Sequence, residues 1–256
     1  MNYGLYLAAS GASSAMARQN VLSNNLANVS TVGFKPDFIG TRFRQSARVE
    51  DNLMWMDSNA LLEQLGGGVF PTQTMISLAQ GPLRATDDPL DLAIEGEGFL
   101  MVDHGGEPAL TRDGRLAVMP DGTLVHSSDG AAVLDTSGAP IRVDRTLPIE
   151  VAEDGRIKQG GTVVAQLAVV DVPDASQLTK GGDGTFKFND VVMAQDAAPA
   201  EHARLRQGMV EDSAVNPIEA LNAITGASRA AQGNMRMISA MWDVMGMAVN
   251  RLGRVN

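Results

Sequence analysis

The stretch that decides the fold lies at residues 217–252, PIEALNAITGASRAAQGNMRMISAMWDVMGMAVNRL. Its apolar and small residues recur at alternating spacings of three and four, the heptad pattern of a helix that packs lengthwise against another helix. Asn216 suits an N-cap and Pro217 the first helical position. We therefore predict one long helix with a seam, meaning the positions that face a partner helix. The predicted C-terminal seam is Leu221, Ile224, Ser228, Ala231, Met235, Ile238, Trp242, Met245, Val249 and Leu252.

The remaining faces of this predicted helix carry few charges. Between residues 217 and 252 only Glu219, Arg229, Arg236, Asp243 and Arg251 are charged. A helix that is washed by solvent outside its seam carries more charges, which suggests that a second face is also covered. The pattern alone fits a core helix of a globular domain as well as a helix that packs against other subunits.

Residues 3–27 show a second heptad pattern. Its alanine content lets another helix approach closely. Gly4 and Gly11 each weaken an isolated helix by about 1 kcal/mol relative to Ala. This helix therefore needs a partner, and the C-terminal seam is the predicted one. The predicted N-terminal seam is Leu5, Ala8, Ala12, Ala15, Gln19, Leu22 and Leu26.

The N-terminal helix is predicted to end in the segment NNLANVSTVGFK, residues 24–35. Asparagine and serine side chains compete with helical backbone hydrogen bonds. Asn28 suits a left-handed cap, Gly33 suits a positive φ, and Pro36 biases the residue before it to an extended conformation. A helix stop, a turn and an extended exit are therefore expected. We define the joint motif as Asn24, Asn25, Leu26, Ala27, Asn28, Gly33 and Phe34.

The middle of the chain follows a β pattern. Asp-Gly pairs at 113–114, 121–122 and 129–130 recur every eight residues, which predicts hairpins with strands at 116–119, 123–125 and 131–134. The apolar run at 163–170 predicts one strand that is buried on both faces. Residues 53–65 suit a short helix that ends at three glycines.

The predicted class is α+β. Long N- and C-terminal helices are expected to pair as a coiled-coil-like domain, with a mostly antiparallel β domain inserted between them. The predicted order is an N-terminal helix at 1–28, a connector at 29–80, a β domain at 81–206 and the C-terminal helical segment at 207–256.

Composition excludes several functions. A net charge of −10 disfavours nucleic acid and anionic membranes as partners, and zero cysteines exclude disulfides and thiol catalysis. No apolar run reaches the length of a membrane span. Because no basic residue precedes Arg18, the small-residue stretch at 3–17 is predicted to be part of the folded protein and not a cleaved signal peptide.

We predict no catalytic, cofactor-binding or metal-binding residues. His104, His126 and His202 lie far apart in the sequence. Asp87, Asp88 and Asp91 cluster, but the proline between them favours a turn over a cation site. The acids that remain open to an enzymatic hypothesis, a glycosidase-like pair, are Glu95, Glu97, Asp113 and Asp121.

Four segments together resemble the bacterial flagellar axial proteins, which are the rod, hook and hook-associated subunits. They are residues 24–35, DLAIEGEGFLMV (91–102), LTRDGRLAVMPDGTLV (110–125) and VEDSAVNPIEALNAI (210–224). The chain ends, YGLYLAASGA and MRMISAMWDVMGMAVNRLG, look more similar to the proximal than to the distal rod subunits. The C-terminal helix departs from the usual family pattern at residues 230–232, which leaves the subtype open.

The resemblance implies a structural subunit without a cofactor. It implies export by the flagellar type III export apparatus without a cleaved signal peptide. It also implies polymerisation with copies of itself and with other rod subunits, as the helical shaft of the basal body in the periplasmic space. A distal rod subunit or another axial protein, an adaptor module and a cell-wall-active enzyme are the alternatives.

Overall fold

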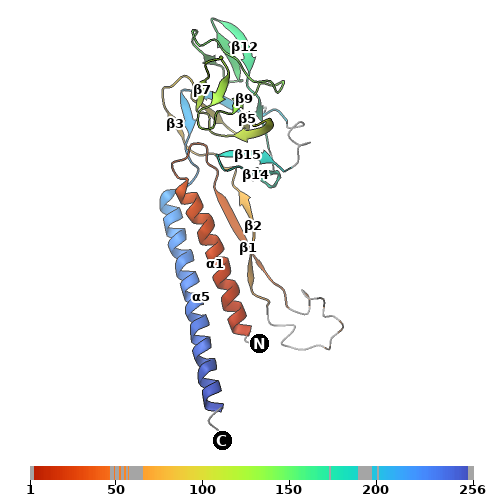
Figure 1. The fold of residues 1–256 in the computed structure, drawn as a ribbon, viewed down its shortest axis with the longest axis vertical. Helices are drawn as coiled ribbons and strands as arrows, with labels where there is room; N and C mark the ends of the chain where they lie inside the picture. The colour runs from red at the N-terminus through yellow and green to blue at the C-terminus, as the bar shows by residue number, and fades with distance from the viewer. Residues whose placement is uncertain are drawn as a thin grey trace. The chain divides into compact units, whose positions relative to one another are not determined.

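The computed structural model describes residues 3–46, 49, 52, 55, 57, 66–172, 174–189, 198–200 and 202–252. The chain divides into two compact units. The helical unit comprises Met1–Leu26, Asp37–Met75 and Asn216–Asn256, and the β unit comprises Ala27–Pro36 and Ile76–Val215. The predicted α+β class is confirmed, with a helix at each end of the chain and antiparallel strands between them (Figure 1).

The helical unit contains the two long helices, α1 (Tyr3–Ala27) and α5 (Pro217–Leu252). The predicted cap is confirmed, because the Asn216 Oδ1 atom accepts a hydrogen bond from the backbone N–H of Ile218 at 3.1 Å. Strands β1 (Asp37–Phe43) and β2 (Val69–Ile76) form a two-stranded sheet. The predicted helix at 53–65 falls where the structure describes only Trp55 and Asp57.

Helices α1 and α5 run side by side (Figure 1). A Cβ atom at Gly4 would lie 2.6 Å from the Met241 Cε atom, and one at Gly11 would lie 3.0 Å from the Asn234 Nδ2 atom. Side chains of α5 therefore pack directly against the α1 backbone at the two glycines. Their cost to helix propensity is offset by this contact.

The β unit holds the remaining strands. Its largest sheet has the order β14-β15-β6-β5-β9-β8-β7, with β13 paired to β5, and all its pairs are antiparallel. Smaller sheets are β10-β11-β12, β16-β4 and β17-β3. The bounds are β3 Leu83–Ala85, β4 Leu92–Glu95, β5 Phe99–His104, β6 Glu107–Thr111, β7 Leu116–Val118, β8 Leu124–His126, β9 Ala132–Val133, β10 Glu150–Val151, β11 Arg156–Gln159, β12 Thr162–Gln166, β13 Val169–Val170, η1 Ala175–Gln177, β14 Leu178–Lys180, β15 Thr185–Phe188, β16 Arg204–Gln207 and β17 Met209–Glu211.

Two apolar clusters fill the β unit. One gathers around Leu92, Leu100 and Ile157, and the other around Phe99 and Phe186. The rings of these two phenylalanines meet edge to face, with their centroids 5.3 Å apart. The predicted hairpin strands at 116–119, 123–125 and 131–134 are confirmed as β7, β8 and β9.

Two predictions for this region are wrong. The run at 163–170 is not one buried strand but parts of β12 and β13, and Val163 is 53% exposed. Among the described strands, β12 is an edge strand that pairs with β11 alone, so its β-branched residues reflect strand propensity rather than burial on both faces. The segment from 207 is also not helical at first, since β17 pairs with β3 and the helix begins at Pro217.

The compact units also differ from the four predicted segments. Residues 27–36, which span the end of the predicted N-terminal helix and the start of the predicted connector, belong to the β unit, whereas 37–75 belong to the helical unit. Among the described helices, none is both long and apolar enough to cross a membrane.

Candidate functional site

Three charged side chains from distant parts of the sequence meet inside the β unit. Lys35, Arg112 and Glu211 are 0%, 3% and 1% exposed, and we call them the joint cluster. The Lys35 Nζ atom lies 2.7 Å from Glu211 Oε1, and the Arg112 Nη1 atom lies 3.0 Å from Glu211 Oε2. One carboxylate therefore pairs with two buried cations, so removing it would leave both without their ion-pair partner.

Backbone groups and one ring make further contacts with the joint cluster, although the buried Arg112 Nε atom has no hydrogen-bond partner among the described residues. Lys35 Nζ donates to the carbonyl of Ala79 at 2.8 Å, and Arg112 Nη2 donates to the carbonyl of Gly96 at 2.8 Å. The backbone N–H of Gly81 donates to Glu211 Oε1 at 2.7 Å. The Arg112 guanidinium also lies over the Phe99 ring, 5.1 Å from its centroid. These bonds offset much of the desolvation cost of burying three charges.

Burial dominates the acid–base behaviour of the two cations. It lowers the pKa of the Lys35 ammonium, and the nearby charge of Arg112 lowers this pKa further, while Glu211 opposes both effects. Burial likewise lowers the pKa of Arg112 against the attraction of Glu211. Glu211 is thus the group that favours the charged forms of Lys35 and Arg112 against burial.

Gly33 of the joint motif lies directly against this cluster. It has a φ of +67°, and its N–H donates to the carbonyl of Glu211 at 2.7 Å. A Cβ atom at Gly33 would lie 2.4 Å from the carbonyl carbon of Arg112 and 2.6 Å from the backbone nitrogen of Asp113. The predicted positive φ is confirmed, and the close contact explains why glycine is needed.

Phe34 also docks on the β unit. Its carbonyl accepts a hydrogen bond from Ala214 N at 3.1 Å, and the Lys180 Nζ atom lies 4.2 Å from its ring centroid. The left-handed cap predicted at Asn28 is wrong, because among the described residues other than glycine only Asn52 and Asp87 have a positive φ. Asn28 instead shapes the turn by accepting a hydrogen bond from Thr31 Oγ1 at 3.2 Å.

The start of the joint motif, Asn24, Asn25 and Leu26, lies at the end of α1 in the helical unit. Asn25 is buried and exchanges two hydrogen bonds with the backbone of Asp37, at 2.6 Å and 2.9 Å. This pairing fixes the beginning of β1 against the last turn of α1. Ala27, by contrast, is grouped with the β unit.

The predicted N-terminal seam lies on a covered face of α1. Ala8, Ala12 and Ala15 are buried, and the larger members Leu5, Leu22 and Leu26 are half-buried, as is Gln19. A neighbouring face contacts the β1–β2 sheet, where the Ser10 Oγ atom accepts a hydrogen bond from Val69 N at 3.3 Å. Helix α1 is therefore covered on two faces within the helical unit.

The predicted C-terminal seam is only half correct for packing within the chain. Ala231 is buried, and Ile224, Ile238 and Met245 are half-buried, as is Ser228. The side chain of Leu252 is not among those described. Four members are instead exposed: Leu221 by 53%, Met235 by 45%, Trp242 by 59% and Val249 by 70%.

For Leu221, Met235 and Trp242, the inward position lies one residue earlier, at Ala220, Asn234 and Met241. Ala227, next to the half-buried Ser228, is buried as well. These residues and Ile224, Ala231, Ile238 and Met245 keep the alternating spacing of three and four. The alanine-rich surface of α1 favours small contact residues because they let the helices approach closely. The pattern of large apolar residues therefore indicated the face of α5 beside the one that contacts α1.

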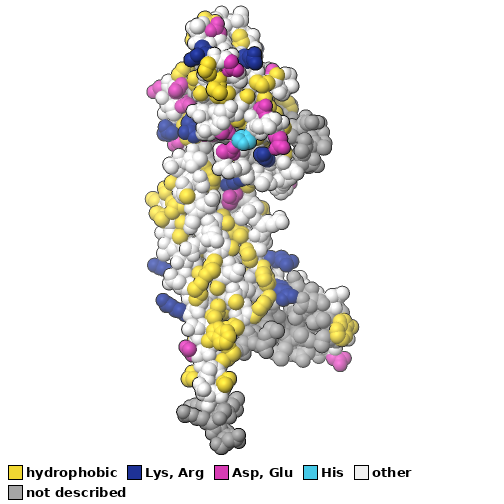
Figure 2. Space-filling model, viewed as in Figure 1, with side chains coloured by type: hydrophobic (Ala, Val, Ile, Leu, Met, Phe, Trp, Pro, Cys, Tyr) yellow, Lys and Arg dark blue, Asp and Glu magenta, His cyan; other side chains and the backbone are white. Residues whose placement is uncertain are grey.

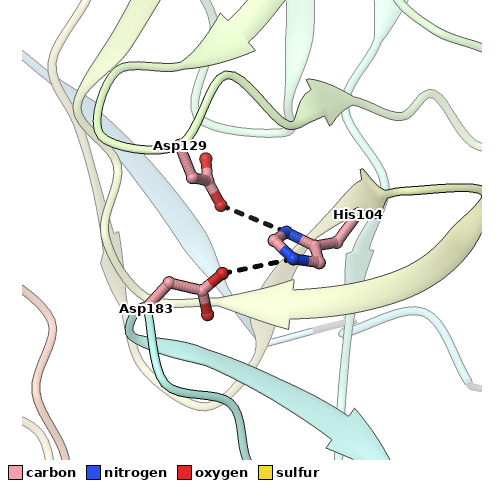
Figure 3. Close-up of side chains that lie close together, drawn as sticks. All are labelled: His104, Asp129 and Asp183. Atoms are coloured by element: carbon pink, nitrogen blue, oxygen red, sulfur yellow. Dashed lines mark ion pairs between the residues drawn. The ribbon is translucent and has the colours of Figure 1, made fainter.

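Outside the joint cluster, the part of the chain that the structure describes contains one group with ligand types suited to a metal, His104, Asp129 and Asp183 (Figure 3). The Asp129 Oδ2 atom lies 3.4 Å from His104 Nδ1, and the Asp183 Oδ2 atom lies 3.4 Å from His104 Nε2. A metal ion binds one ring nitrogen. Because the two carboxylates approach different nitrogens, the geometry is that of a histidine ring between two acids.

The acids considered for catalysis have structural partners. Glu95 pairs with Arg206 at 2.8 Å, Asp113 forms an ion pair with Arg115, and Asp121 accepts a hydrogen bond from Thr123 N at 3.0 Å. Glu97 is exposed. Asp88 Oδ1 accepts a hydrogen bond from the N–H of Leu90 at 2.9 Å, as the predicted turn requires. These contacts account for Glu95, Asp113 and Asp121 as parts of the fold.

The geometry defines an α+β protein whose chain ends form a discontinuous helical unit with an apolar outer face. Comparisons with known proteins agree. Residues 5–35 match the model described as "Flagella basal body rod protein", and residues 93–165 match the "Flagellar hook protein FlgE/F/G D1 domain".

Full-length relatives extend the match. The flagellar basal-body rod protein FlgF of Caulobacter vibrioides is 31% identical over all of both chains. FlgF of Rhizobium meliloti is 30% identical over 99% of each chain, and FlgG of C. vibrioides is 30% identical over 97% of this chain and 98% of its own. The chain belongs to the flagellar basal-body rod protein family.

Proposed function

We propose that this chain is a structural subunit of the flagellar basal-body rod. Its copies polymerise with one another and with other rod subunits into the helical shaft between the motor and the hook, in the periplasmic space. The observation that carries this proposal is the exposed stripe of α5, defined as Leu221, Met235, Trp242 and Val249. Figure 2 shows hydrophobic side chains exposed along the helical unit. A contiguous exposed apolar surface marks an association site.

The stripe is suited to an open assembly. It adjoins the face that packs on α1, so a further helix can pack beside the pair without disturbing it. A contact between this face and a different face of the next copy is heterologous, and such contacts generate helical polymers unless the rotation closes. The few charges on α5 favour burial of this second face in the assembled rod.

Export through the type III apparatus, as an unfolded chain without a cleaved signal peptide, is part of the same proposal. The helical unit combines residues from both chain ends, so it forms only when the whole chain is present. Closing such a long loop adds little entropic cost, because that cost grows with the logarithm of loop length. The assembled neighbours then add the apolar contacts that stabilise the long helices.

We expect Trp242→Ser to block incorporation into rods while leaving the single chain folded. Trp242 is exposed on the stripe, and its truncation removes about 3 kcal/mol of potential contact energy at each interface. Co-sedimentation of assembled rods and circular dichroism of the single chain measure the two effects. Arg236→Ser, an exposed change on the same helix outside the stripe, serves as the control, and normal incorporation of Trp242→Ser would refute the interface.

Fluorescence offers a direct readout of the same surface, because the chain has only two tryptophans, Trp55 and Trp242. In a Trp55→Phe background, the emission of Trp242 should shift to the blue when rods form.

Ile238→Asp tests the inward face of α5. It places a charge in the α1–α5 contact, and we expect it to separate the two helices even before assembly.

Within the family, a proximal position similar to that of FlgF is our first choice, with a distal FlgG-like position as the alternative. The C. vibrioides FlgF relative aligns over the whole of both chains, and the FlgG relative over slightly less. Electron microscopy of basal bodies that lack this chain separates the two. Loss of the distal rod is expected for a proximal subunit, whereas a rod of nearly full length would favour the distal assignment.

An adaptor module and a cell-wall-active enzyme are the rival functions. An adaptor forms a finite complex, so the stoichiometry of purified complexes distinguishes it from an open-ended rod subunit. For an enzyme, Glu97 is the exposed acid without a hydrogen bond or ion pair among those described above. Normal motility and assembly of Glu97→Gln would leave no role for that carboxylate in catalysis.

A further inference from the structure

A chain of alternating acids and bases crosses one end of the large sheet, next to the joint cluster. His126 is at its centre, and its side chain is 1% exposed. The His126 Nδ1 atom lies 2.7 Å from Asp129 Oδ1, and the Nε2 atom lies 3.3 Å from Asp113 Oδ2. Both ring nitrogens therefore face a carboxylate inside the β unit.

A neutral imidazole cannot satisfy both carboxylates, because it carries a single N–H. The short contact to Asp129 takes that N–H, so the lone pair of Nε2 would then face Asp113 Oδ2 in a site without solvent. A protonated ring has a donor at each nitrogen and adds a charge opposite to both acids. The 3.3 Å contact has the distance of an ion pair if the ring is protonated, but it is not an aligned hydrogen bond, since Nε2 has no hydrogen-bond partner in the part of the chain that the structure describes.

The charges around His126 support the protonated form. Asp113 also receives Arg115, whose Nε donates to Oδ1 at 2.9 Å. Asp129 is shared with His104, whose other nitrogen faces Asp183 (Figure 3). Ser128 Oγ lies 3.3 Å from His126 Nδ1 and is the remaining polar neighbour. The groups nearest the buried ring are thus two carboxylates, each with one further cationic or titratable partner.

Asp113 connects this chain of charges to the joint motif. It follows Arg112 of the joint cluster, and the peptide bond between these two residues is the surface on which Gly33 lies. Arg112 reaches Glu211 on one side of this peptide, while Asp113 reaches His126 on the other. The position of the loop at residues 111–115 is therefore fixed by ionic contacts on both sides of the Gly33 contact.

We propose that the folded β unit holds one proton on His126, and that this proton latches the 111–115 loop, and with it Gly33, in the docked arrangement. Loss of the proton loosens the Asp113 contact and raises the opening rate of the segment at residues 27–36. The joint motif is then docked in a pH-dependent way, more tightly below the folded pKa of His126 than above it.

The direction of the effect follows from linkage. Burial on its own lowers the pKa of His126, but the contacts with Asp113 and Asp129 outweigh burial and raise it above the ordinary value. The stabilisation is therefore complete below about pH 6.5, the pKa of an unfolded histidine, and is lost as pH rises through the folded pKa. Each pKa unit between the folded and unfolded values changes the opening equilibrium about tenfold.

Nuclear magnetic resonance tests the proton directly in the full chain. Long-range nitrogen–proton correlation spectra of uniformly labelled protein, recorded as a function of pH, should show both His126 ring nitrogens protonated to a pH above the ordinary histidine pKa of about 6.5. His126→Gln assigns the signal, because it removes one of only three histidines. A ring that loses its proton at or below the ordinary histidine pKa would overturn the proposal, and this readout does not depend on the stability of any variant.

Hydrogen exchange tests the latch. After correction for the intrinsic base catalysis of exchange, the protection of the Gly33 amide should fall as the pH rises from about 6.5 through the folded pKa of His126. The fall should vanish in Asp129→Asn, which removes one of the two acids, and persist in His104→Gln, which leaves both in place. A pH-independent Gly33 amide in the wild-type chain, or the same fall in Asp129→Asn, would contradict the coupling.

Discussion

Glu211→Gln is expected to destabilise the β unit by about 3–5 kcal/mol, because the substitution keeps the shape of the side chain and removes the carboxylate that pairs with both Lys35 and Arg112. For a domain of this size, each 1 kcal/mol lowers the melting temperature by about 2–4 °C. Thermal unfolding followed by circular dichroism measures the loss. Hydrogen exchange at residues 27–36 would show whether the joint motif opens first.

The neighbouring residue provides a matched control. Asp212 pairs with Arg84 at 3.0 Å, but both side chains are more than a third exposed. Asp212→Asn should therefore change stability by no more than about 1 kcal/mol. If the two variants lost similar stability, the buried arrangement of the joint cluster would not be what stabilises the unit.

The pH dependence of the Glu211→Gln effect is a further check. Lys35 can release its proton when it loses its counter-charge, whereas Arg112 stays charged. Burial already lowers the pKa of Lys35, so the cost of the variant should shrink as pH rises. A cost that stayed constant up to the alkaline limit of folding would mean that Lys35 is not the group left uncompensated.

The local parts of the fold were predictable from sequence because they depend on spacing over a few residues. The Asp-Gly pairs placed strands β7 to β9, Asn216 and Pro217 placed the start of α5, and Gly33 was predicted to take a positive φ. These features depend on hydrogen bonds and steric limits within a turn or two of the chain. Sequence reasoning therefore reached them without tertiary information.

The joint cluster was not predictable in the same way. Lys35 and Glu211 are separated by 176 residues, and each looks like an ordinary surface charge in its own segment. The available signal was indirect: the four segments that resemble axial proteins include Lys35, Gly96, Arg112 and Glu211, and all four residues meet in one contact network. Segments recognised together can share a site, but no single motif shows which of their residues touch.

The half-correct C-terminal seam has a different cause. Heptad analysis selected the large apolar residues, while the contact with α1 uses Ala227 and the close approach at Gly4 and Gly11. Where one helix has two usable faces, the larger residues mark the face that buries more area, and that is not always the face used within the chain. We therefore assign the exposed stripe of α5, which follows the heptad spacing, to contacts with other subunits.

Gly33→Ala is the second large effect that we expect, with a loss of about 2–5 kcal/mol. An alanine at a φ of +67° costs about 1–2 kcal/mol, and a Cβ atom 2.4 Å from the Arg112 carbonyl carbon adds an overpacking cost of about 1–3 kcal/mol. The neighbour is backbone, held by the joint cluster on one side and by His126 on the other. It therefore cannot move away as a flexible side chain would.

Gly138→Ala separates these two costs. Gly138 has a φ of +80°, and a Cβ atom there meets no atom within 4 Å, so it carries the backbone cost alone. Chemical denaturation gives the free energy of unfolding of both variants. We expect Gly138→Ala to be more stable than Gly33→Ala by at least about 1 kcal/mol. Equal losses would mean that Gly33 is needed only for its φ. A larger loss at Gly33, together with faster exchange at residues 27–36, would show that its contact with the Arg112–Asp113 peptide is what holds the joint motif in place.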